Sequence, residues 1–132
     1  CLDRVSVGEL FFLEGMASVF PLVIRGRLEP GEFAAYLNFS EKDLATLKAE
    51  KKGLINHLKA AWNNRGFGAM APFFGGQGFF KDRNLPPRSG YFLGFLYFSR
   101  ILKSHGHHLI RDLTGLQGEE ILVRYPLEGY LD

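Results

Sequence analysis

The sequence has little of what marks several common classes of protein. It contains one cysteine in 132 residues, Cys1, which excludes a disulfide within the chain. The longest apolar stretch near its middle, YFLGFLYF, has eight residues, whereas a membrane-spanning helix needs roughly 20. The sequence therefore predicts a fold that depends neither on a redox compartment nor on a transmembrane segment.

The chain also lacks a strong charge of either sign. The formal net charge is +2, and no run of lysine and arginine reaches five residues. Proteins that bind nucleic acid usually gather basic residues on one surface, so we expect no nucleic-acid partner. The start, CLDRVSVGEL, is charged and has no apolar core of the kind that a signal peptide carries. Cys1 then has two interpretations, the lipid-bearing residue of a mature lipoprotein or, as we favour, a cut from a longer protein.

What the chain does contain is apolar and aromatic side chains. Apolar residues make up 46% of it and aromatic residues 14%, with 13 phenylalanines, which is enough to form one hydrophobic core. We expect residues 1–132 to be a single, mainly α domain of four to six helices with a long aromatic and glycine-rich loop. Hydrophobic periodicity predicts the helices at Val5–Phe20, Ser40–Asn64 and Ser89–Lys103, with one or two short ones in HHLIRDLTGLQGEEILVRY.

Several local signals set the expected boundaries. The first helix is apolar nearly all round, which is typical of a helix at the centre of a domain. Pro21 is expected to stop or kink it, and Leu22–Ile24 is the one candidate for a short strand. Ser40 is a candidate N-cap residue for the second helix. The segment from Phe67 to Gly90 has glycines and prolines that disfavour a long regular element, yet it carries five phenylalanines.

Glu14 is the most unusual residue, because it lies within the apolar run FFLEGMASVF. A buried carboxylate is costly unless it pairs, becomes protonated or binds a metal ion. One interpretation is that Glu14 is partly exposed or pairs with Arg4, Arg25 or Arg27. The other is that it is a ligand in a site, and the small residues Gly15, Ala17 and Ser18 would let another element approach that face.

A second candidate is PPRSGYFLG, where Arg88 and Tyr91 fall in the first turn of a predicted helix and can project into a cleft. Its simpler interpretation is a helix anchor with a buried tyrosine. His105, His107 and His108 in SHGHHL do not have a known zinc-binding spacing, and their place at a helix end explains them more simply. The chain has no G-x-S-x-G, no phosphate-binding loop and no H-E-x-x-H.

Two of these segments together resemble zinc metallopeptidases of the gluzincin type. LFFLEGMASVF is similar to their L-x-x-E-G-x-A-x-[YF] helix in its E-G-x-A core, and PRSGYFLG is similar to a later P-x-x-x-G-Y-x-x-G segment in its G-Y-x-x-G part. The resemblance implies that Glu14 is the third zinc ligand and that Tyr91 lines the site and stabilises the oxyanion of the tetrahedral intermediate. It implies a weaker catalytic role for Arg88 and a peptide or protein as substrate.

The chain departs from this family at one decisive point. In the family an H-E-x-x-H helix supplies two zinc ligands and the general base, and this segment would lie upstream of Cys1. We therefore expect the C-terminal helical subdomain of a longer zinc peptidase, inactive as this chain alone. The alternative is a non-enzymatic helical module that binds a peptide or partner helix in an aromatic groove lined by Phe73, Phe74, Phe79 and Phe80.

Overall fold

The structure, a computed structural model, describes residues 2–26, 30–75 and 87–132. These residues form one 3-10 helix, eight α-helices and no strand, which confirms a mainly α fold, with more helices than the four to six expected. The elements are η1 (Leu2–Arg4), α1 (Val7–Ile24), α2 (Pro30–Tyr36), α3 (Glu41–Ala61), α4 (Phe67–Phe74), α5 (Ser89–His105), α6 (Leu109–Leu113), α7 (Gly118–Arg124) and α8 (Leu127–Leu131). None of the described helices is long and apolar enough to cross a bilayer.

The expected end of the first helix is wrong. α1 contains Pro21 and continues to Ile24, so the strand expected at Leu22–Ile24 is the last turn of a helix. Pro21 is exposed, and its carbonyl accepts a hydrogen bond from the Arg25 N–H at 3.2 Å. Val19 is buried, and Val23 packs against the core. The apolar face of α1 therefore continues past the proline, and its packing keeps the backbone helical despite the missing donor.

The aromatic loop is also more regular than its composition indicates. Its first eight residues form α4, which has Pro72 inside it. Gly66 precedes the helix with a φ of 87°, a backbone conformation that favours glycine. Met70 and Phe73 of α4 are buried in the core. The short helix thus forms because its apolar face finds a partner, while Phe79 and Phe80 lie outside the described residues.

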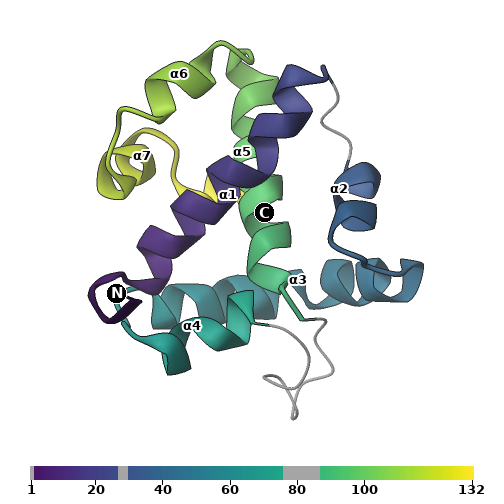
Figure 1. Cartoon of the computed structure of the whole chain (residues 1–132), viewed down its shortest axis with the longest axis vertical. Coiled ribbons are helices and arrows are strands. Elements are labelled where there is room, and N and C mark those ends of the chain that lie inside the picture. The colour runs from purple at the N-terminus through teal and green to yellow at the C-terminus, as the bar shows by residue number, and fades with distance from the viewer. Residues whose placement is uncertain (1, 27–29, 76–86) are drawn as a thin grey trace.

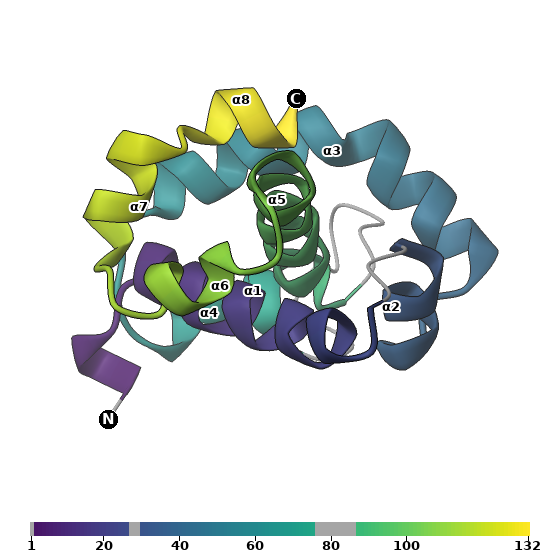
Figure 2. The same ribbon diagram turned by 90° about the horizontal axis from the view of Figure 1, so that it is seen from above.

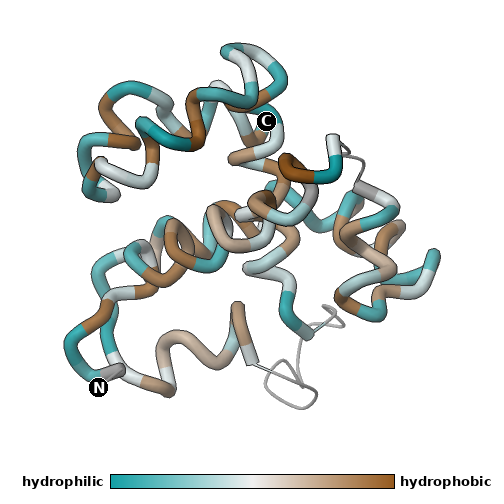
Figure 3. Tube along the Cα trace, turned by 45° about the horizontal axis from the view of Figure 1, so that its top comes forward, coloured by the Kyte–Doolittle hydropathy of each residue, from teal (hydrophilic) through white to brown (hydrophobic). Residues whose placement is uncertain are grey.

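α5 lies at the centre of the domain. Figure 1 shows α1 crossing it, and Figure 2 shows α5 between α1 on one side and the α3–α8 layer on the other. α1 and α5 share the most extensive helix–helix contact in the described structure. Hydrophobic positions recur along α1 in the hydropathy trace of Figure 3. The two helices that the sequence marks as apolar nearly all round are therefore the pair around which the others assemble.

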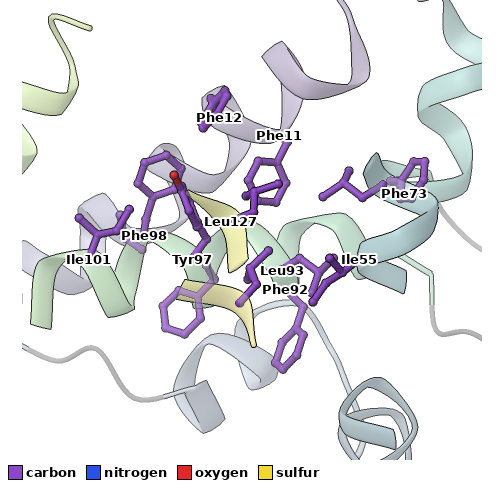
Figure 4. Close-up of a cluster of buried hydrophobic side chains, with 14 of the residues drawn as sticks. Phe11, Phe12, Ile55, Phe73, Phe92, Leu93, Tyr97, Phe98, Ile101 and Leu127 are labelled. Carbon is purple, nitrogen blue, oxygen red and sulfur yellow. The ribbon is translucent and has the colours of Figure 1, made fainter. Parts of the chain in front are cut away.

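An aromatic cluster fills the space between these helices (Figure 4). The Tyr97 and Phe98 rings of α5 pack edge to face with centroids 5.0 Å apart. Phe11 and Phe12 of α1 meet the Tyr97 ring at 5.7 and 6.2 Å. The buried Tyr97 hydroxyl donates a hydrogen bond to the Tyr125 carbonyl oxygen at 2.5 Å, so the polar atom is satisfied where the ring is buried.

Two glycines set the distance between α1 and α5. A Cβ atom on Gly94 would lie 2.8 Å from the Cα of Gly15, and one on Gly15 would lie 3.0 Å from the Cα of Gly94. Real Cβ atoms do not approach a backbone atom so closely, so the two helices touch backbone to backbone at this point. The expectation that the small residue Gly15 lets another element approach α1 is confirmed. Gly90 plays the same part against α4, where a Cβ would lie 2.8 Å from the Phe73 carbonyl oxygen.

We predict that Gly94→Ala lowers the free energy of unfolding by about 1–3 kcal/mol, because the added methyl group forces α1 and α5 apart. Urea unfolding followed by circular dichroism measures this change. Gly53→Ala is the matched control, since its Cβ would meet only a Glu50 carboxylate oxygen at 3.9 Å. That control should raise stability by about 0.5–1 kcal/mol through helix propensity. Equal effects of the two substitutions would contradict the close crossing.

Candidate functional site

Glu14 lies on a flank of α1, next to the crossing glycine Gly15. Its side chain is half-buried, so it is neither sealed in the core nor fully in water. No described residue forms a hydrogen bond or an ion pair with its carboxylate. Arg4 and Arg25 therefore do not pair with it, and Arg27 lies outside the described residues. Glu14 is a carboxylate in an apolar neighbourhood that has no cationic partner within the described part of the chain.

Tyr91 lies in the first turn of α5, one turn before Gly94. Its ring packs edge to face on Phe74 of α4, with centroids 5.4 Å apart and an interplanar angle of 83°. Burial is the main cause that raises the pKa of the Tyr91 hydroxyl above its usual value, and the charge of Glu14 raises it further. The Arg88 guanidinium acts in the opposite direction and lowers this pKa. The Tyr91 hydroxyl thus remains protonated at neutral pH and is available as a hydrogen-bond donor.

Arg88 is the residue immediately before α5. Its backbone has a φ of 64°, in the left-handed region, which costs energy for a residue other than glycine. The Arg88 N–H donates to the Gly75 carbonyl oxygen at 3.2 Å, and its own carbonyl accepts from the Tyr91 N–H at 3.1 Å. These bonds fix the end of α4 against the start of α5. The side chain of Arg88 is exposed and close enough to Tyr91 to influence its pKa.

The structure therefore places both Glu14 and Arg88 close enough to Tyr91 to influence its pKa, although Glu14 and Tyr91 are 77 positions apart in the sequence (91 − 14). The close crossing of α1 and α5 is the cause. Glu14 precedes Gly15 by one residue, and Tyr91 precedes Gly94 by three, so the two side chains leave their helices near the same contact point. The contribution of the Glu14 charge to the raised pKa of Tyr91 agrees with this placement.

Ser89 is a residue at this site that the sequence analysis did not single out. It is fully buried, and its hydroxyl has no hydrogen-bond partner among the described residues. An unsatisfied buried hydroxyl costs about 1–3 kcal/mol, so it is an unusual feature of a stable core. A serine at the start of a helix is usually interpreted as a capping residue. No sequence pattern indicates that the Ser89 hydroxyl is buried.

The described residues contain no group of three His, Cys, Asp or Glu side chains that could hold a metal ion. A catalytic zinc site needs three protein ligands and a water, and the described residues place no such set of ligands around Glu14. The histidine run is placed elsewhere. His105 Nε2 lies 2.8 Å from the Tyr130 hydroxyl, and its ring packs against Tyr125 with centroids 5.3 Å apart.

Comparison with family models, with curated proteins and with solved structures finds no match to this chain. The interpretation of the site therefore depends on its own geometry and on the motifs in the sequence.

The outward face of α1 is apolar and uncovered. Leu13 is 57% exposed, Phe20 45% and Ile24 74%, and Ala17 is exposed between them. Their spacing of four, three and four residues places them in one line on the helix. We call Leu13, Ala17, Phe20 and Ile24 the α1 stripe. Glu14 lies at one edge of this stripe, so the site and the uncovered surface are adjacent.

The groove expected from the aromatic loop is only partly described. Phe73 is buried in the core and is not available to line a surface groove. Phe74 is half-buried against Tyr91. Phe79 and Phe80 lie outside the described residues. Phe73 therefore packs in the core, and Phe74 packs against Tyr91 of the candidate site.

We predict that Glu14→Gln moves the pKa of Tyr91 down toward 10, because it removes the negative charge that helps to hold the hydroxyl protonated. Titration of the tyrosine Cζ resonances by NMR measures this pKa. The wild-type value should lie above 10, and burial should keep part of the shift in the variant. Glu50→Gln, an exposed substitution on α3, is the control and should leave Tyr91 unchanged. The same Tyr91 pKa in wild type and in Glu14→Gln would show that the two groups are not neighbours.

Proposed function

We propose that this chain is the C-terminal helical subdomain of a zinc-dependent peptidase of the gluzincin type. In the intact protein Glu14 is one of the zinc ligands, and Tyr91 lines the site for peptide-bond hydrolysis. The observation that carries the proposal is that Glu14 and Tyr91 both lie near the Gly15–Gly94 crossing, where the Glu14 charge influences the pKa of Tyr91. The two motifs that prompted the resemblance are far apart in the sequence, and a shared site is what the resemblance requires of them.

The state of each side chain supports these roles. Glu14 has no cationic partner within the described residues, so its oxygens are available to a metal ion. Burial and the Glu14 charge raise the pKa of Tyr91, which leaves a neutral hydroxyl that can donate a hydrogen bond to a developing oxyanion. Arg88 is exposed at the same helix start. Its positive charge would favour a substrate carboxylate or an oxyanion, a role that remains secondary.

The α1 stripe supports the proposal that a further segment packs here. A helix that is apolar on all sides is normally covered on all sides, yet Leu13 and Ile24 are more than half exposed. Glu14, which needs further ligands to hold a zinc ion, and the uncovered α1 stripe lie on adjacent faces of the same helix. One upstream helix that carries H-E-x-x-H would supply both, and when bound the zinc ion would polarise the scissile carbonyl and activate water.

Zinc content tests this proposal directly. We predict that a longer protein with the upstream segment binds about one zinc per chain, measured by mass spectrometry after dialysis. Glu14→Gln in that protein should lose most of the metal, because it removes one of three ligands. Glu50→Gln should keep the full amount. The present chain alone should bind no stoichiometric zinc.

Two results would overturn the assignment. Full zinc occupancy in the Glu14→Gln form of the longer protein would remove Glu14 from the site. Stoichiometric zinc on the 132-residue chain alone would show a different metal site, built from residues that the resemblance does not include.

A further inference from the structure

A pocket lies on the same flank of α1 as Glu14. The last turns of α1 and the short helix α2 enclose a pocket of about 610 Å³, a size within the usual range for ligand sites. Pro21 and Arg25 line it from α1, and Phe33, Ala35 and Tyr36 line it from α2. None of these residues belongs to the candidate zinc site, so the pocket needs its own explanation.

Helix geometry connects this pocket to Glu14. Ser18, Pro21 and Arg25, which line it, follow Glu14 at four, seven and eleven residues, so all four lie along one edge of α1. At 1.5 Å per residue, the pocket extends from about 6 to about 16 Å beyond Glu14 along the helix axis. An extended peptide advances about 3.3 Å per residue. A side chain roughly two to five residues from a bond held at Glu14 would therefore reach the pocket.

The walls of the pocket are mainly apolar and aromatic. The buried Phe33 ring stacks on Phe95 of α5 at 4.2 Å, which fixes it as a rigid base. Tyr36 is 83% exposed, and its ring stacks on Phe33 at 6.5 Å, so it forms a rim. Because Phe33 is only 2% exposed, it supports the rim from beneath, and an aromatic guest can pack against the exposed Tyr36 ring.

The polar groups of the pocket do not favour a charged guest. Ser18 already donates its hydroxyl hydrogen to the Gly15 carbonyl oxygen at 2.6 Å. Arg25 and Glu32 stand on opposite walls with opposite charges, so neither sign of charge gains a clear advantage. Shape and apolar surface therefore determine which side chain fits.

We propose that the pocket between α1 and α2 is a specificity subsite that binds an aromatic side chain of a peptide substrate. Its assignment to a substrate rests on the proposed peptidase function. The subsite itself consists only of residues in this chain, and its binding can be measured without zinc.

The experiment compares two blocked pentapeptides, one of alanines and one with a single phenylalanine, for binding to the 132-residue chain. Isothermal titration measures the affinities, and amide NMR shifts locate the bound peptide. The phenylalanine peptide should bind at least fivefold more tightly and shift resonances of Phe33 and Tyr36. Ala35→Trp, which fills the pocket from α2, should abolish this preference. Ala49→Trp, at an exposed position on α3, is the matched control and should preserve it.

Equal affinity for the two peptides, or no binding of either, would overturn the subsite. So would an unchanged preference in Ala35→Trp. If that variant does not fold, Tyr36→Ala takes its place and should weaken binding of the phenylalanine peptide at least threefold. Failure of these tests leaves the zinc measurements on the longer protein unaffected. Full zinc occupancy in the Glu14→Gln form of the longer protein, with aromatic preference retained, would remove Glu14 from the zinc site and leave the peptide-binding pocket in place.

Discussion

The contact between the backbones of Gly15 and Gly94 is the constraint on which the rest of the structure depends. Neither position has room for a Cβ atom while the helices keep their present distance. The short distance lets Phe11, Phe12, Tyr97 and Phe98 interdigitate between α1 and α5, and the aromatic core is the result. It also brings Glu14 of one helix near enough to Tyr91 of the other for its charge to help raise the pKa of the Tyr91 hydroxyl. The packing of the aromatic core and the position of the candidate site thus both depend on the Gly15–Gly94 contact.

The two central helices are covered to different degrees. α5 is buried along most of its length, between α1 on one side and the α3–α8 layer on the other. α1 is equally apolar, but its outward stripe faces solvent in the described structure. Burial of apolar surface is the main stabilising term in folding, so an uncovered apolar face on a central helix indicates a surface for another chain segment. Because Glu14 lies at the edge of this stripe, the proposed upstream helix that covers the stripe would also complete the zinc site.

The sequence was most informative where local chemistry decides the structure. Ser40 caps α3 as expected, with its hydroxyl accepting from the Asp43 N–H at 3.1 Å. The start of α5 and the close approach of another element at Gly15 also followed from composition and spacing. The continuation of α1 past Pro21 and the helix at Phe67–Phe74 did not, because packing against the core outweighs the local preferences of proline and glycine. Such contacts between distant segments are not visible in a single sequence.

The candidate site also combines features that local sequence patterns indicate with features that only the fold reveals. Glu14 was identifiable as an oddity, and Tyr91 as a residue at a helix start, from local patterns alone. Only the three-dimensional structure shows that the two lie near each other and that no arginine among the described residues pairs with Glu14. The buried hydroxyl of Ser89 and the pocket beside α2 also depend on three-dimensional packing, which no motif in the chain encodes.

X-ray absorption at the zinc edge, on the longer protein, tests the central claim most directly. We expect a zinc ion with two imidazole nitrogens and one carboxylate oxygen at about 2.0–2.2 Å, and loss of that oxygen contribution in Glu14→Gln. Zinc coordination that is identical in the wild type and in Glu14→Gln would contradict it.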